Sequence, residues 1–169
     1  MAPRVLPLPL VLLALFSAPT FSQSAMGPPP APSAQSDEMR RGVAHFDRAF
    51  YELTPHKRDL EASREFDLAI AEFERELTLR PAAAEAHRYL ARIRMVRKEF
   101  RSAGEHYDAL TALNPLDIDT YVLAALAYVE AGDVAAARAR LVTAVGQTSD
   151  PAVRARLAEY LAKLDARKP

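Results

Sequence analysis

Two stretches of this sequence decide its fold: EFDLAIAEFERELTLRP at residues 65–81 and EFRSAGEHYDALTALNP at residues 99–115. A third stretch, DVAAARARLVTAVGQTS at residues 133–149, continues the same spacing of 34 residues. Each stretch has an alanine with a large or branched apolar residue three places before it and a bulky apolar residue four places after it. The alanines are Ala69, Ala103 and Ala137, and a proline closes each of the first two stretches. A fixed period of this length predicts an array of helical repeats.

The repeated residue types explain how such an array would pack. Alanine lets two helices approach closely, and the bulky residue one helical turn later fills the space beside it. Proline cannot continue a helix, so Pro81 and Pro115 separate one unit from the next. With Leu90 and Ala91 in the second copy and the turn glycine Gly132 in the third, the sequence resembles the tetratricopeptide repeat over roughly residues 38–149. The resemblance implies an all-α fold, an α-solenoid of about three helix–turn–helix units followed by a C-terminal capping helix.

The chain is expected to have three parts that differ in composition. We predict a secretory signal peptide at residues 1–22, a disordered proline-rich linker at residues 23–36 and a repeat domain at residues 37–165. Within the repeat domain, the expected units are residues 38–81, 84–115 and 118–149, and the capping helix is residues 150–165. The prolines and small uncharged residues of the linker favour extended conformations over a packed core.

The prediction of a signal peptide depends on the first 22 residues. Arg4 precedes an apolar run at residues 5–16, which is too short to cross a bilayer, because a spanning helix needs about 20 residues. Small residues follow at Thr20 and Ser22, so we place cleavage after Ser22, with Ser24 as the second choice. An uncleaved anchor is the alternative. We expect an exported protein, periplasmic or secreted, without stable membrane insertion after cleavage.

The charge balance argues against nucleic acid as a partner. The chain has 22 basic and 22 acidic residues, so no net field attracts a phosphate backbone or an anionic membrane surface. It has no cysteine, which excludes both a disulfide framework and a lipid-modified cysteine. Arginine outnumbers lysine and alanine is abundant, a composition typical of bacteria with GC-rich genomes.

The apolar pattern places the helices. We expect them at about residues 37–53, 62–77, 83–96, 100–113, 118–131 and 134–145, with a last helix that starts at Asp150. Ser36 can cap the first helix. Thr54 and Pro55 are residue types that start helices, so the second helix could begin there. The connection at residues 54–64 is longer than a simple repeat allows, and it is either a tolerated insertion or a partner-specific feature.

No residue pattern points to catalysis, a metal or a cofactor. The four histidines, which lack metal-ligand spacing, are His45, His56, His87 and His106. We interpret the last two as residues that pack between helices. Glu72, Glu74 and Glu76 alternate along one helix, and we interpret them as a solvated surface. We therefore expect no catalytic residue, no metal site and no cofactor, and we predict that the protein is not an enzyme.

The resemblance assigns a partner-binding groove to the first helices of the repeats. The groove residues that it implies are Glu85, Arg88, Arg92, Met95, Val96, Asp119, Val122, Leu126 and Val129. Arg88 and Arg92 lie one helical turn apart, and arginine suits the carboxylates of a partner. The equal alternative is a solvated arginine face that Glu85 and Glu99 neutralise.

From this groove we predict a non-catalytic scaffold or adaptor that holds an acidic, partly apolar segment of a protein partner. Two other functions stay open at this point. One is an enzyme or small-ligand-binding protein whose site is built from groove residues, and the other is a self-associating structural component.

Overall fold

The computed structural model describes residues 35–166, within which the chain is all-helical, with seven α-helices and no β-strand. The helices are α1 (Asp37–Asp47), α2 (Asp59–Leu79), α3 (Ala84–Val96), α4 (Phe100–Leu113), α5 (Ile118–Glu130), α6 (Val134–Gln147) and α7 (Pro151–Asp165). The all-α fold class predicted from the sequence is confirmed for this part of the chain. The predicted signal peptide, and all of the predicted linker except Gln35 and Ser36, lie outside the described residues.

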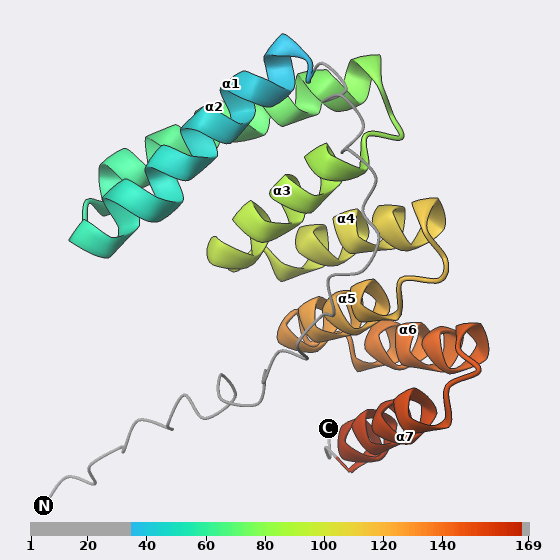
Figure 1. Cartoon of the computed structure of the whole chain (residues 1–169). Helices are drawn as coiled ribbons and strands as arrows, with labels where there is room; N and C mark the ends of the chain where they lie inside the picture. The colour runs from blue at the N-terminus through green and yellow to red at the C-terminus, as the bar shows by residue number, and fades with distance from the viewer. Residues whose placement is uncertain (1–34, 167–169) are drawn as a thin grey trace, which may run out of the picture. The chain divides into compact units, whose positions relative to one another are not determined.

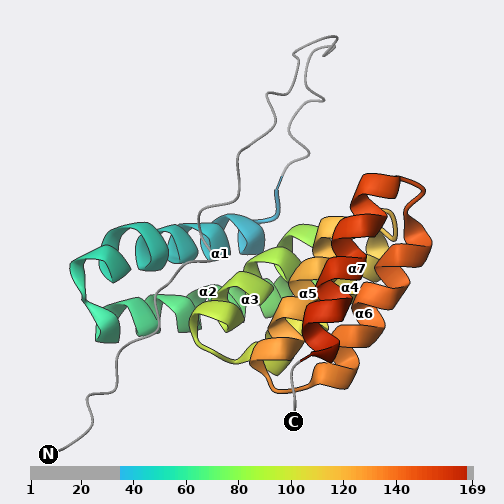
Figure 2. The same cartoon turned by 90° about the horizontal axis from the view of Figure 1, so that it is seen from below.

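Each helix packs mainly against the helices that precede and follow it in the chain. Figure 1 and Figure 2 show α1 and α2 as an antiparallel pair, and Figure 1 shows α3 to α7 following one another in chain order. A smaller contact joins α1 to α3, so the first helices of the first two pairs also meet.

The interior consists of three successive clusters of buried side chains. The first lies between α1, α2 and α3, the second between α3, α4 and α5, and the third between α5, α6 and α7. The repeated alanines Ala69, Ala103 and Ala137 fall one in each cluster and are fully buried. The alanines that define the sequence period therefore lie where neighbouring helices touch.

Two turns of the chain repeat the same backbone geometry at the sequence period. Arg80 ends α2 with φ −137° and ψ 82°, and Asn114 ends α4 with φ −137° and ψ 83°. The N–H of Arg80 donates to the carbonyl of Glu76 at 2.7 Å, and that of Asn114 donates to the carbonyl of Leu110 at 2.9 Å. The backbone thus turns in the same way at the ends of α2 and α4, the second helices of two successive pairs.

The first helix pair is longer than the pairs that follow. α2 has 21 residues, whereas α4 and α6 have 14 each. α1 continues into a π-helix, η1 (Arg48–Leu53), and then into a short 3-10 helix, η2 (Thr54–His56). In both Figure 1 and Figure 2, the end of this pair extends past the ends of α3. The long connection predicted at residues 54–64 is thus mostly helical, and its residues lengthen the pair.

The expectation that Thr54 starts the second helix is wrong. The Thr54 hydroxyl donates to the carbonyl of Ala49 at 2.8 Å, so this residue belongs to the end of the first helix. Lys57 then takes a left-handed φ of 56° and turns the chain, and α2 starts only at Asp59. The hydroxyl can serve either end of a helix, and here the carbonyl of the helix already formed satisfies it.

Candidate functional site

Three arginines, one on α3, one in the turn after it and one at the start of α4, form ion pairs with carboxylates. The ion pairs are Arg94 with Glu74 and Glu99, Arg97 with Asp67, and Arg101 with Asp133. Arg97 also donates to the carbonyl of Ser63 at 2.8 Å. These pairs join α2 to α3 and α4 to the start of α6, so these arginines serve the contacts between helices.

Arg88 and Arg92 differ from these neighbours. Among residues 35–166, no carboxylate oxygen lies within 4.0 Å of either guanidinium. Arg88 is exposed and Arg92 is half-buried. Glu99 pairs with another arginine, and Glu85 accepts a hydrogen bond from Gln35 at 3.5 Å. Within the described part of the chain, α3 therefore carries two positive charges that no ion pair neutralises.

The Arg92 guanidinium lies over aromatic rings of α1 and η1. Its central carbon is 4.9 Å from the ring centroid of Phe46 and 5.5 Å from that of Phe50. This contact is favourable because the face of an aromatic ring carries negative partial charge. It holds the Arg92 side chain in place although residues 35–166 supply no ionic partner.

The rings under this guanidinium belong to a larger aromatic cluster. Phe46 and Phe50 stack with centroids 5.4 Å apart, and Tyr51 meets Phe50 edge-on at 5.0 Å. From α3, Tyr89 contacts Phe46 at 5.0 Å and stacks on Phe73 at 4.9 Å. Tyr51 is 60% exposed, whereas the other four rings are buried or half-buried. The cluster thus runs from the interior of the first helix pair to one exposed ring.

The hydroxyl of Tyr89 stays protonated in this environment. Burial raises its pKa, and the nearby carboxylates of Asp47 and Glu85 raise it further, while Arg92 lowers it. A general base at neutral pH needs a pKa near 7. Tyr89 is therefore a neutral hydroxyl that can donate a hydrogen bond, and it does not act as a base.

The structure places the predicted groove residues in two groups. Glu85, Arg88, Val96, Asp119 and Leu126 are exposed, whereas Arg92, Met95, Val122 and Val129 are half-buried. Met95 packs against the second interior cluster, and Val122 and Val129 pack against the third. Within residues 35–166, no hydrogen bond or ion pair joins the α3 members to the α5 members. The residues with the most free surface are therefore Glu85, Arg88, Val96, Asp119 and Leu126.

Sequence reasoning missed the aromatic part of this site. No functional role was predicted for Phe50, Tyr51 or Tyr89. The available signal was the density of rings at residues 46–51, directly before the unusually long connection.

The expectation that Glu72, Glu74 and Glu76 form a solvated surface is wrong for two of the three. Glu72 is 9% exposed and Glu76 is 2% exposed, whereas Glu74 is exposed. Glu72 and Glu76 lie one turn apart on α2, on the side that packs against α1. The local alternation of charges could not show that a neighbouring helix covers this side.

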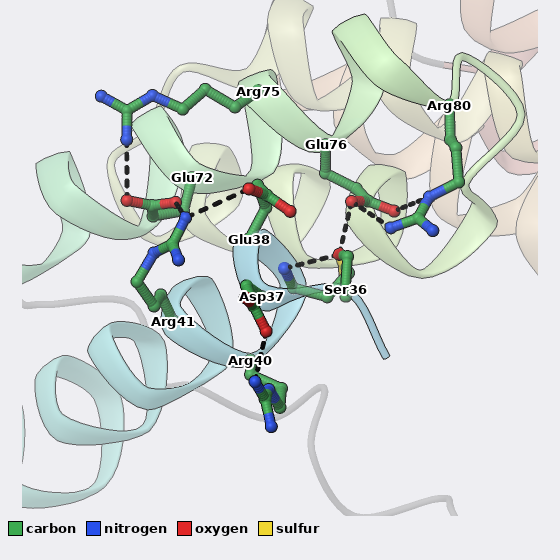
Figure 3. A network of polar contacts seen from close by, with 10 residues as sticks. Ser36, Asp37, Glu38, Arg40, Arg41, Glu72, Arg75, Glu76 and Arg80 are labelled. Carbon is green, nitrogen blue, oxygen red and sulfur yellow. Dashed lines mark hydrogen bonds and ion pairs between the residues drawn. The ribbon is translucent and has the colours of Figure 1, made fainter. Parts of the chain in front are cut away.

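Both buried carboxylates have partners, as Figure 3 shows. Arg41 donates to Glu72 at 2.9 Å, and its hydrogen bond holds the pKa of that carboxyl below its usual value against the effect of burial. Arg80 donates twice to Glu76, at 2.7 Å each, and the Ser36 hydroxyl donates at 2.6 Å. These bonds, with that of Arg80 the larger, lower the pKa of Glu76. The network ties the start of α1 to the end of α2.

His87 and His106, which the sequence left as separate packing residues, contact each other between α3 and α4. Their Nδ1 atoms are 3.1 Å apart, and Nε2 of His87 lies 3.2 Å from the carbonyl oxygen of Pro81. A carbonyl only accepts, so when both rings are neutral Nε2 of His87 donates to Pro81 and its Nδ1 accepts from Nδ1–H of His106. Burial, followed by the charges of His87 and Arg94, lowers the pKa of His106 to about 4. Within the described residues, no group of three potential metal ligands gathers around this pair.

Two surface depressions lie apart from the predicted groove. One, of about 470 Å³, lies at the turn before α4 beside Lys98 and Arg101. The other, of about 350 Å³, lies between α4 and α6 beside Asp108 and Arg140. Neither is lined by a predicted groove residue. In the second depression, the carboxylate of Asp108 is occupied by Arg140 and by the Tyr128 hydroxyl, which donates at 2.7 Å.

The sequence matches no family model, and no curated protein is significantly similar to it. Among the helices of residues 35–166, none is long and apolar enough to cross a membrane. The contacts between α1, η1 and α3 are therefore the features of this protein that bear on its function.

Proposed function

We propose that this protein is an exported, non-catalytic scaffold of the tetratricopeptide-repeat type, an α-solenoid that holds a segment of another protein. Three features support the repeat assignment. Helices contact their neighbours in the chain, the alanines that repeat every 34 residues are buried between them, and Arg80 and Asn114 end two helices with matching angles. Stacked helix pairs of this kind present extended surfaces that suit binding to protein segments.

The observation that carries the binding proposal is the charge of Arg88 and Arg92, for which residues 35–166 supply no ion-pair partner. Within the same residues the neighbouring Arg94, Arg97 and Arg101 all have carboxylate partners. A partner carboxylate would supply the missing ion pair, and arginine can bind it through two parallel hydrogen bonds. Because the rings of Phe46 and Phe50 already hold the Arg92 side chain, binding costs less conformational entropy.

The partner that fits this surface is an acidic, partly apolar segment. Val96 and Leu126 are 43% and 41% exposed and supply apolar area on α3 and α5. In such an interface the charges mainly set the rate of encounter and the selectivity, while apolar contacts set the lifetime of the complex.

Selection of random displayed peptides on the purified protein tests this function. Peptides selected on the parent protein are then measured against the double variant Arg88→Glu/Arg92→Glu. We expect their affinity to fall by about tenfold or more, since each charge reversal near a carboxylate costs on the order of 1 kcal/mol. Added salt should also weaken binding, because charges are screened beyond about 8 Å at physiological ionic strength.

The matched control is Arg101→Glu/Arg138→Glu, which makes the same change in charge on α4 and α6. Both control arginines are more than half exposed, and each forms one surface ion pair. Equal affinity of the selected peptides for the parent and for the α3 double variant would contradict the proposal, provided that both proteins show the same helical circular dichroism.

A further inference from the structure

The extra length of the first helix pair has a local consequence at α3. α3 and α5 have 13 residues each, and a first helix of that length from Asp37 would end before Phe50. Phe50 and Tyr51 therefore lie in the additional helical turns, in the π-helix η1. π-Helical segments are rare and are found frequently at functional sites. The added residues thus bring the Phe50 ring to the Arg92 guanidinium and place the Tyr51 ring beside Phe50.

We propose that η1 and α3 form a recognition subsite for two neighbouring side chains of a partner protein, one acidic and one aromatic. The acidic side chain binds the guanidinium groups of Arg92 and Arg88. The aromatic side chain packs on Tyr51 and Phe50. This inference rests on the proposed function, and it adds the pair of residues that the partner must supply.

The acidic member of the pair is inferred from the surroundings of the Arg92 guanidinium. Its guanidinium carbon lies 4.9 Å above the Phe46 ring, and among the described residues no carboxylate is in ion-pair range. A guanidinium that lies over a ring keeps its N–H groups at its edge, where they can meet a planar carboxylate. Arg88, one turn earlier on α3, adds a second positive charge without a described partner.

The aromatic half follows from Tyr51. Its ring is 60% exposed, although it touches Phe50 at 5.0 Å and Phe46 at 6.4 Å. Aromatic rings gain from offset or edge-to-face contacts with one another beyond the gain from burial. A partner ring at this position would extend the aromatic cluster by one member and cover its exposed end.

Two acidic residues near the subsite could instead favour a basic side chain of a partner. The carboxylates of Asp47 and Glu85 lie close enough to Tyr89 to raise its pKa. Neither forms an ion pair with Arg88 or Arg92 within residues 35–166. If these carboxylates dominated the field, the subsite would prefer a basic side chain. The test therefore includes a basic peptide.

The test measures binding of three short synthetic peptides, blocked at both ends, to the full-length purified chain by fluorescence anisotropy. The first peptide contains Glu-Phe pairs separated by glycine and serine. The second has lysine in place of each glutamate, and the third has alanine in place of each phenylalanine. We expect the Glu-Phe peptide to bind at least about tenfold more tightly than either of the other two.

Two variants assign the halves of the pair to their residues. Arg92→Lys keeps the charge but loses the planar guanidinium, with its paired N–H groups and its contact with the rings. It should therefore weaken binding of the Glu-Phe peptide by about tenfold. Tyr51→Ala should weaken binding of the Glu-Phe peptide and leave the affinity for the third peptide, which has Glu-Ala pairs, unchanged. Arg138→Lys and Tyr160→Ala make the same changes at exposed positions of α6 and α7, and they should alter neither affinity.

Equal binding of the Glu-Phe and Lys-Phe peptides, binding of none of the three, or no effect of Tyr51→Ala would each overturn the subsite. The random-peptide selection separates this failure from failure of the proposed function. If selected peptides depend on Arg88 and Arg92 but lack the acidic–aromatic pair, the subsite is wrong and the scaffold function stands. If no selected peptide depends on these arginines, both proposals are wrong.

Discussion

Lys98 occupies the same backbone position after α3 that Gly132 occupies after α5. The two residues are 34 positions apart, and both have positive φ, 60° for Lys98 and 77° for Gly132. Their N–H groups donate to equivalent carbonyls, Met95 for the first and Val129 for the second, each at 3.0 Å. Two different residues thus adopt one left-handed turn, which glycine enters without steric cost and lysine does not.

Lys98→Gly should therefore stabilise the protein, by about 0.5–1 kcal/mol, because it relieves the left-handed strain. Gly132→Ala should destabilise it by about 1 kcal/mol for the converse reason. Urea unfolding followed by circular dichroism measures both changes. Gly146→Ala is the control: Gly146 lies in α6, and apart from its own helix backbone and chain neighbours no described residue comes within 4 Å of an added Cβ, so this change should be neutral or stabilising. If both glycine-to-alanine changes shifted the free energy of unfolding in the same direction, the left-handed turn at Gly132 would not be the cause.

Ala103→Leu should destabilise the protein by about 1–3 kcal/mol, because the residue is fully buried in the cluster between α3, α4 and α5. Ala112→Leu makes the same change at an exposed position of the same helix, and it should stay within about 0.5 kcal/mol of the parent. The measurement is the free energy of unfolding in urea of each variant, compared with that of the parent. Similar values for the two variants would argue against close helix contact at the repeated alanine.

Ser36→Ala should destabilise the protein by about 1–2 kcal/mol. The Ser36 hydroxyl oxygen accepts from the N–H of Met39 at 3.0 Å and caps α1, as the sequence predicts, and the same hydroxyl donates to the buried Glu76. Ser63→Ala, in the second turn of α2 and exposed, is the matched control and should not destabilise. Equal unfolding midpoints for the two variants would show that the cap contributes nothing.

Stability should fall as the pH is lowered from 7 towards 4, partly because of His106. Its pKa is about 4 in the folded protein and about 6.5 when exposed. Between these pH values His106 is protonated in the unfolded chain and neutral in the folded protein. Its contribution to the free energy of unfolding is therefore complete above pH 6.5 and is lost as the pH approaches 4. Since His106 is only partly buried, the loss should be on the order of 1 kcal/mol.

His106→Gln should flatten the dependence of unfolding free energy on pH in this window. His56→Gln, at an exposed histidine in η2, should leave the dependence unchanged. Glu72 and Glu76 act in a different window, because their pKa values are lowered from 4.5 and their stabilisation is lost only as the pH falls below that value. An unchanged slope between pH 7 and 5 in His106→Gln would rule out this origin.

Export should remove about the first 22 residues, since a short apolar run is followed by small residues at Thr20 and Ser22. N-terminal sequencing of the protein from its native host should find Gln23 as the first residue. A terminus at Met1 or Ala2 on membrane-bound protein would favour an uncleaved anchor. A Thr20→Arg/Ser22→Arg variant should keep the longer chain, because large charged residues block the positions that the peptidase inspects.

The sequence by itself determined the bounds of α3 to α6 to within two residues, but not the end of α1 or the start of α2. Phe100–Leu113 was predicted with the bounds that the structure has, and the other helices from α3 to α6 differ by one or two residues at their ends. The burial of Ala69, Ala103 and Ala137 also followed from the sequence alone. Apolar period, caps and prolines are properties of segments shorter than a repeat, so a single chain displays them directly.

Only the tertiary structure decided which side chains meet. Ser36 reaches the buried Glu76 from the start of α1, and His87 meets His106 where α3 packs against α4. The same is true of the Arg92 guanidinium over Phe46, from which the proposed site follows. These contacts depend on how helices cross and on the length of η1. Such relations arise from packing between distant segments, and no local pattern of residues encodes them.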